Sequence, residues 1–168
     1  MDSRILIIYH CFWRFNMDKN QTLVYCLKRE QNVVNLVLTF FSTKLDFNKV
    51  VYTEWTAKDV LAHIVLWHES FANNIMSIVN DEEPNLLKGL GTEINENGVK
   101  EFRKYSIEKL KEKLAVAQEK INKNIKNNKI KLIPYREGVK RKFTREEHLD
   151  IVYRHIKRHL IGIIKMIV

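Results

Sequence analysis

Residues 55–84, WTAKDVLAHIVLWHESFANNIMSIVNDEEP, form one long amphipathic pattern with a marked start and a marked end. Thr56 is a good helix N-cap, and Asp59 three residues later completes the pattern of a capping box. Apolar side chains recur between them and the end at helical spacing, at Val60, Ile64, Trp67, Phe71, Ile75 and Ile78. Pro84 cannot continue a helix, so we predict a helix that ends near Asn80.

Three further long helices are predicted from the same kind of spacing. They run from about Lys19 to Leu45, from the cap Ser106 to Asn127, and from the capping box Thr144–Glu147 to about Ile167. Glu30 falls on the apolar stripe of the first of these helices and is a polar interruption of it.

The links between these helices are longer than simple turns. A short helix is predicted over residues 95–104, and residues 129–143 are irregular and hold a short extended piece. Long helices bury their apolar faces most simply by packing side by side. The sequence therefore predicts an all-α four-helix bundle, while the long links leave its topology open.

Composition supports this fold class and excludes others. A chain of 168 residues favours one domain, and 45% hydrophobic with 29% charged residues excludes a disordered chain. Only five glycines and two prolines are present, whereas turn-rich all-β folds need more of both. The two cysteines have no paired spacing, which favours a reducing, cytoplasmic location.

The first residues differ from the rest. Residues 4–15 are apolar, but His10 and Arg14 interrupt the run and no small-residue cleavage site follows. We expect Met17 to be the true start, with residues 1–16 a non-native or disordered extension and residues 17–168 a single domain. A genuine short anchor is the alternative.

Much of the formal net charge of +9 lies in one stretch, Lys120–Lys142, which holds nine Lys or Arg and one acid. Such a stretch can attract nucleic acid, an anionic membrane or an acidic partner. Tyr135 is its one aromatic residue, too few for the stacking platform of a single-strand binder. We therefore favour a solvated surface over a nucleic-acid interface.

Three of the six histidines are candidate ligands of a metal ion. His155 and His159 are four residues apart, so both imidazoles lie on one face of the last helix. His63 borders the buried stripe of the second long helix and can supply a third nitrogen to a divalent metal. His148, seven residues before His155, is a spare ligand, and His68 is read as a surface or packing residue. A set of hydrogen-bonded core histidines is the alternative to a metal site.

Two segments resemble a known group of proteins, the DinB-like superfamily of four-helix bundles and within it the ClbS/DfsB-like branch. They are WTAKDVLAHIVLW at residues 55–67 and HIKRH at residues 155–159. Further likeness lies at Asn95, at Phe102-Arg103 and at Ser106-Ile107-Glu108. The resemblance covers about residues 21–168, and the first segment is the more specific of the two.

The resemblance implies an up-down-down-up bundle with a zinc or nickel site at His63, His155 and His159. It also implies either transfer of a low-molecular-weight thiol or, as in the ClbS-like branch, detoxifying hydrolysis of a strained electrophilic ring.

The favoured hypothesis is a metal-dependent hydrolase or thiol transferase that acts on a small reactive or toxic compound. Glu30 is the candidate base or a residue that orients a histidine, and Trp55, Trp67 and His148 are candidates for the substrate pocket. A non-enzymatic module that sequesters a small molecule is the alternative. Association with nucleic acid is a weaker third hypothesis, and a homodimer is left open.

Overall fold

The computed structural model describes residues 22–168, and the interpretation of residues 1–16 as an extension lies outside this part. It contains five helices and no strand within these residues. The helices are α2 (Leu23–Phe40), α3 (Ala57–Val79), α4 (Gly91–Phe102), α5 (Ile107–Asn124) and α6 (Arg145–Ile167). None of these helices is both long enough and apolar enough to cross a bilayer. The predicted all-α class is confirmed.

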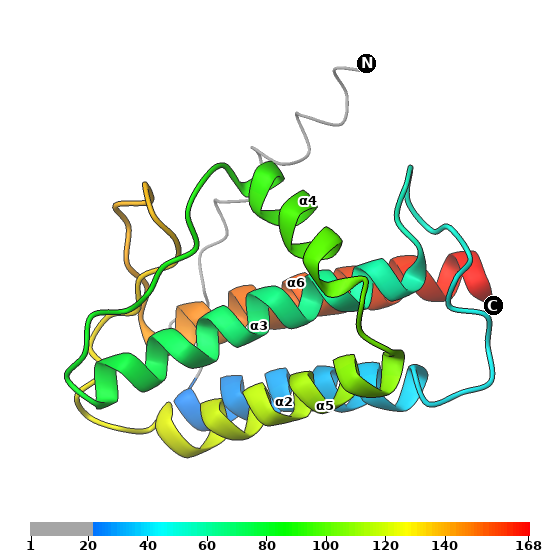
Figure 1. Cartoon of the computed structure of the whole chain (residues 1–168). Coiled ribbons are helices and arrows are strands. Elements are labelled where there is room, and N and C mark those ends of the chain that lie inside the picture. The colour runs from blue at the N-terminus through cyan, green and yellow to red at the C-terminus, as the bar shows by residue number, and fades with distance from the viewer. Residues whose placement is uncertain (1–21) are drawn as a thin grey trace.

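Four of the helices form the bundle, and their directions follow the order up, down, down, up. Figure 1 shows α2 and α6 running in one direction and α3 and α5 in the other. The closest packing joins the parallel pairs α3 with α5 and α2 with α6, and α3 also packs against α6. The shorter α4 lies outside the bundle against α3 (Figure 1). This is the topology that the resemblance implied.

The predicted helix starts are confirmed where a side-chain cap marks them. The Asp59 N–H donates to Thr56 Oγ1 at 3.1 Å, and the Thr56 N–H donates to the Asp59 carboxylate at 3.0 Å. The same reciprocal pair joins Thr144 and Glu147 at the start of α6. Ser106 caps α5 by accepting a hydrogen bond from a backbone N–H of the first turn. Caps are therefore the most reliable boundary signal in this chain.

Helix ends were predicted less well. The first long helix was predicted to reach Leu45, but α2 ends at Phe40. There the hydroxyl of Thr43 donates to the Phe40 carbonyl, and the ring of Phe41 packs on that of Phe47 at 4.6 Å. This packing turns the chain back towards the bundle, so the helix cannot continue.

The C-terminal end of α5 and the start of α4 also differ from the positions predicted from the sequence. α5 stops at Asn124 rather than Asn127, because the Asn127 side chain accepts a hydrogen bond from the Lys129 N–H and forms a turn. α4 begins at Gly91, four residues before the predicted start, because the Glu93 carboxylate accepts a hydrogen bond from the Leu90 N–H. Hydrogen bonds from local side chains, rather than the spacing of apolar residues, therefore set these two helix boundaries.

The irregular link between α5 and α6 holds the predicted extended piece as a single antiparallel bridge. Ile133 and Phe143 exchange two backbone hydrogen bonds of 2.7 and 2.9 Å, and both side chains are buried. The bridge holds the loop between them, which carries Tyr135, next to α3 and α6. The Tyr135 side chain of this link therefore reaches Trp67 of α3.

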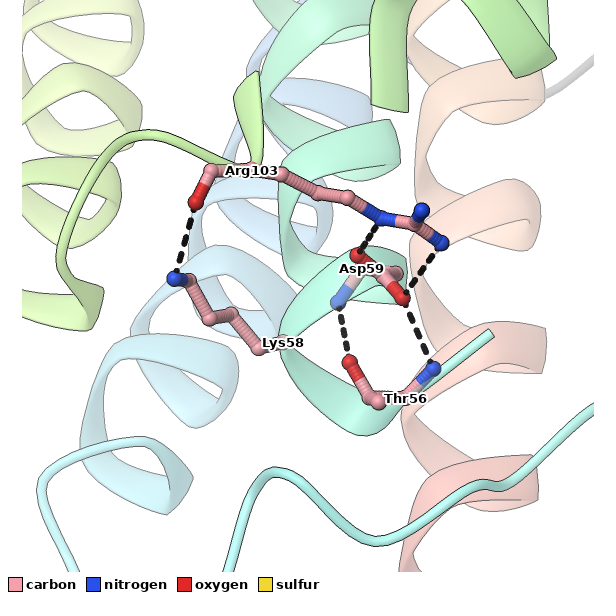
Figure 2. A network of polar contacts seen from close by, with 4 residues as sticks. All are labelled: Thr56, Lys58, Asp59 and Arg103. Atoms are coloured by element: carbon pink, nitrogen blue, oxygen red, sulfur yellow. Dashed lines mark hydrogen bonds and ion pairs between the residues drawn. The ribbon is translucent and has the colours of Figure 1, made fainter. Parts of the chain in front are cut away.

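A polar network fixes the start of α3 to the chain that follows α4 (Figure 2). Arg103 donates from Nε and from its terminal nitrogen to the two oxygens of Asp59, at 2.9 and 3.2 Å. The Lys58 ammonium donates to the Arg103 carbonyl at 3.0 Å. Burial raises the pKa of the Asp59 carboxyl, but the bonds from Arg103 and Thr56 outweigh it and leave that pKa below its usual value.

We expect Arg103→Ala to cost about 1–2 kcal/mol of unfolding free energy, because it leaves the buried Asp59 carboxylate with fewer donors. The lowered pKa means that this stabilisation is present above about pH 4 and is lost as pH falls through the folded-state value. Urea unfolding at pH 7 and pH 3 measures both effects.

Arg141→Ala is the matched control, since Arg141 also bonds to the third residue of a capping box, Glu147. That carboxylate is more exposed, at 31% against 5% for Asp59, so the control should cost less than about 0.5 kcal/mol. Equal costs for the two variants would contradict the role assigned to the Asp59–Arg103 pair.

Candidate metal centre

Three histidines from two helices meet inside the bundle. His63 lies on α3, one turn after Asp59, and His155 and His159 lie one turn apart on the antiparallel α6. The Nε2 of His155 is 2.8 Å from that of His63 and 3.1 Å from that of His159. The three possible ligand atoms all lie within 4.8 Å of one another. The structure therefore brings together the residues that sequence spacing could not connect across the bundle.

The spacing of the three nitrogens fits a divalent metal. Zn–N bonds of about 2.0–2.1 Å at tetrahedral angles place two ligand nitrogens roughly 3.3 Å apart. The two measured separations are a few tenths of an ångström shorter. A small outward movement of the rings would suffice, and three imidazoles leave a fourth position for an exchangeable ligand.

All three imidazoles are neutral at physiological pH. Burial, reinforced by His159, lowers the pKa of His63 to about 3. Burial and then Arg158 lower the pKa of His159 to about 4, and burial with the neighbouring histidines holds the pKa of His155 well below its usual value. Neutral imidazoles have a free nitrogen lone pair, which is the form that binds a metal.

Aromatic rings rather than carboxylates surround the histidines. Trp55 lies against His63 at 5.2 Å between ring centroids, and Tyr52 meets His159 edge-on at 5.9 Å. The Nδ1 atoms of His63 and His159 are buried and have no hydrogen-bond partner among the residues that the structure describes. Metal-binding histidines usually donate from their second nitrogen, so ring packing has to orient these two. Trp55 therefore lies next to His63, but it is not among the lining residues of the cavity described below, and its role in a substrate pocket stays a prediction.

Glu30 is fully buried but lies in a different cluster. Its Oε2 accepts a hydrogen bond from Gln118 Nε2 at 2.8 Å, and its Oε1 lies 3.5 Å from His68 Nε2. No hydrogen bond joins it to the three histidines among the residues described. Burial raises the pKa of Glu30 to about 8, against a smaller opposing effect of the Gln118 bond. Its role as a base or an orienting residue stays a prediction.

His68 was read as a surface or packing residue, and the surface alternative is wrong. The side chain is 1% exposed, and its Nε2 lies 2.9 Å from Gln118 Oε1. Burial lowers the pKa of His68 to about 4. Glu30, His68 and Gln118 therefore form an uncharged network at neutral pH that links α2, α3 and α5.

His148 and Trp67, both proposed for the pocket, line a cavity of about 30 Å³ between α3 and α6, and His155 also lines it. His148 is not a spare ligand of the three-histidine cluster. Its ring stacks face to face on Phe71, with 4.0 Å between centroids and 4° between planes. Trp67 donates from Nε1 to Asn95 Oδ1 at 2.8 Å and stacks on another aromatic ring.

Sequence reasoning missed three residues of this region: Gln118, Asn74 and Tyr135. Gln118 lies four residues after Leu114 on the buried face of α5, so its position on that stripe could have revealed it. Asn74 directly precedes a core residue and had a weaker signal of the same kind. Tyr135 lies in the irregular link, where no periodicity indicates which side chains point inwards.

Comparison with known proteins supports the fold. No protein-family model and no curated protein matches the sequence. Among solved structures, the crystal structure of the mycothiol-dependent maleylpyruvate isomerase is similar, with a TM-score of 0.70 and 12% identity. The crystal structure of a histidine-to-alanine mutant of that isomerase has the same TM-score and 11% identity.

Each comparison covers 89% of this chain, which spans 63% of the isomerase chain. At such low identity the likeness establishes the fold alone. The chain therefore shares the helical-bundle fold of that isomerase over the part that is matched.

Proposed function

We propose that the chain is a metal-dependent enzyme in which His63, His155 and His159 hold Zn²⁺ or Ni²⁺. Its reaction is the transfer of a low-molecular-weight thiol to a small reactive compound. The single observation that carries the proposal is the convergence of three neutral imidazole nitrogens within the bundle. A metal ion held there would act as a Lewis acid that lets a thiol or water ionise near neutral pH.

Thiol transfer is preferred to hydrolysis because the similar solved structures are of a mycothiol-dependent enzyme. Hydrolysis of a strained electrophile, and with it membership of the ClbS/DfsB-like branch and a detoxifying role, is the second form of the proposal. Both forms place the reaction in the cytoplasm, a reducing compartment where thiols persist.

The protein holds the three imidazoles in position and excludes water from around them. Burial keeps the three imidazoles neutral, and Trp55 packs on His63. Trp67 and His148 line the cavity that His155 and Tyr135 of the link between α5 and α6 also line. In the described part of the chain no carboxylate shares a hydrogen bond or an ion pair with the three rings, so Glu30 would act as a base only from its neighbouring cluster.

The reaction can be tested with a chromogenic electrophile. In the attack of glutathione on 1-chloro-2,4-dinitrobenzene, sulfur bonds to the ring carbon, chloride leaves and the thiol proton goes to solvent. Lowering a thiol pKa from about 8.5 to about 7 raises its thiolate fraction at pH 7 from about 3% to about 50%, which is roughly 16-fold. We expect zinc-loaded protein to accelerate conjugation by at least about that factor over chelator-treated protein. An equal rate for both preparations, repeated with cysteine as the thiol, would reject thiol transfer.

A non-enzymatic sequestering role is the second candidate, and the aromatic cavity beside His155 favours it. Retention of a small molecule through purification, without turnover, would support this alternative over catalysis.

Nucleic-acid association is less favoured, because cations of the Lys120–Lys142 stretch have partners within the protein. Lys120 donates to Asn73, and Arg141 donates to Glu147. Absence of DNA binding at low salt would remove this idea.

A further inference from the structure

We propose that the cavity between α3 and α6 is a binding subsite for an uncharged, hydrogen-bonding group, such as a carboxamide or a hydroxyl. That this group belongs to the substrate rests on the function proposed above, because His155 is one of the residues that line the cavity. A group held there would lie directly beside the candidate metal centre.

The walls of the cavity are aromatic. Trp67 and Tyr135 stack with 5.1 Å between ring centroids and 14° between planes, and Phe71 and His148 stack at 4.0 Å and 4°. Trp67 and Tyr135 are half-buried, whereas Phe71 and His148 are buried, so the first pair lies at the outer end. Flat apolar surfaces of this kind accept a small planar group.

Two buried polar atoms of the lining residues have no partner in the described structure. They are Oδ1 of Asn74 and Nδ1 of His148, in side chains only 1% and 2% exposed. The Asn74 amide nitrogen donates to the Pro134 carbonyl at 3.4 Å, which leaves Oδ1 as the free end of that amide. A buried acceptor without a donor is unfavourable, so the occupant has to donate a hydrogen bond to Asn74.

The cavity selects a neutral occupant. No Lys, Arg, Asp or Glu among residues 22–168 lines it, and burial lowers the pKa of His148 to about 3, so this ring carries no charge at neutral pH. An anion would lose its hydration without gaining a counter-charge. A carboxamide meets the requirement, and a carboxylate of the same shape does not.

Size limits the occupant to one end of a molecule. A volume of about 30 Å³ has room for about two water molecules, or for a terminal group of similar size. Trp67 at the outer end is held by its bond to Asn95 of α4, so this wall is formed before a ligand arrives. The rest of the substrate must extend past Trp67 and Tyr135.

Acetamide and acetate, which have the same shape and differ in charge, test the subsite. Each is titrated into zinc-loaded and into EDTA-treated protein, and the indole N–H signals of Trp67 and Trp55 are followed by ¹H–¹⁵N NMR. Trp67 lines the cavity, whereas Trp55 lies at His63 and serves as the internal reference. Trp67→Phe assigns the signal. A four-atom ligand at the ceiling of about −1.5 kcal/mol per non-hydrogen atom has a dissociation constant of roughly tens of micromolar at best, so the titration extends through the millimolar range.

We expect acetamide to shift the Trp67 signal saturably in both preparations and acetate to leave it unchanged at tenfold higher concentration. Asn74→Leu should weaken acetamide binding about fivefold or more, because one hydrogen bond is lost. Asn73→Leu, which changes the same residue type at the exposed neighbouring position, should not. His148→Phe keeps an aromatic ring against Phe71 and gives a second test if Asn74→Leu does not fold.

The proposal is overturned if acetate binds as well as acetamide, if neither shifts Trp67, or if Asn74→Leu and His148→Phe bind acetamide as the wild type does. The zinc content of each preparation is measured separately. Protein that binds zinc but not acetamide loses the subsite and keeps the proposed function. Protein that binds acetamide but not zinc keeps the subsite and loses the metal centre.

Discussion

His155→Ala is expected to lower the affinity for zinc or nickel by more than about 100-fold. The Nε2 atom of His155 lies close to the Nε2 atoms of both His63 and His159. Without His155, only one ligand from each helix remains, and the nitrogen between them is lost. Removing even an indirect partner of a metal ligand typically costs 10–100-fold, and loss of a direct ligand should exceed that. Calorimetric titration of metal into the purified variant, in competition with a chelator, measures the change.

His148→Phe is the matched control for metal affinity. His148 lies on the same helix and is buried, but it is outside the cluster and stacks on Phe71, which a phenyl ring can also do. Metal affinity should stay within about threefold of wild type. Equal losses in the two variants would show that the metal site needs an intact α6 rather than these three ligands.

Glu30→Gln is expected to stabilise the protein by roughly 3 kcal/mol at pH 7. Glu30 has a folded-state pKa of about 8 against 4.5 when exposed, so at neutral pH the unfolded chain gains a charge that the folded state does not. A glutamine keeps the carbonyl that accepts the bond from Gln118 and never ionises. Urea unfolding of both proteins at pH 7 gives the difference.

The same variant has a characteristic pH dependence. A raised folded-state pKa means that the contribution of Glu30 is fully present below about pH 4.5 and declines as pH rises to about 8. The wild type should therefore lose stability relative to Glu30→Gln across this window, and the gap should stop growing above it. Glu69→Gln is the control for the loss of an acid that is only partly buried and is paired with Lys113. Parallel curves for wild type and Glu30→Gln would contradict the buried, protonated state.

The bundle could be predicted from the sequence because its evidence is local. Apolar spacing gave four long helices, and the capping boxes at Thr56 and Thr144 fixed two of their starts. Helix ends depended on contacts made after the chain turns, such as Phe41 against Phe47, and these have no local signal. Direction and neighbour relations came only from the family resemblance.

The candidate site also has a part that local sequence spacing predicts and a part that depends on how the helices pack. The pair His155 and His159 follows from helical spacing, but the position of His63 opposite them depends on the packing of α3 against α6. Glu30 was correctly placed on a buried stripe, while its partners on α3 and α5 could not be known. The aromatic cavity joins three segments, including an irregular link, and needed the structure.

We infer that three imidazoles from two helices bind one divalent ion. X-ray absorption spectroscopy at the zinc edge, on protein loaded with one equivalent, tests it most directly. We predict first-shell scattering from nitrogen or oxygen at about 2.0–2.1 Å with the multiple-scattering signature of three imidazoles, reduced to two in His63→Ala. Failure to retain zinc, or a spectrum with one imidazole or none, would contradict the account.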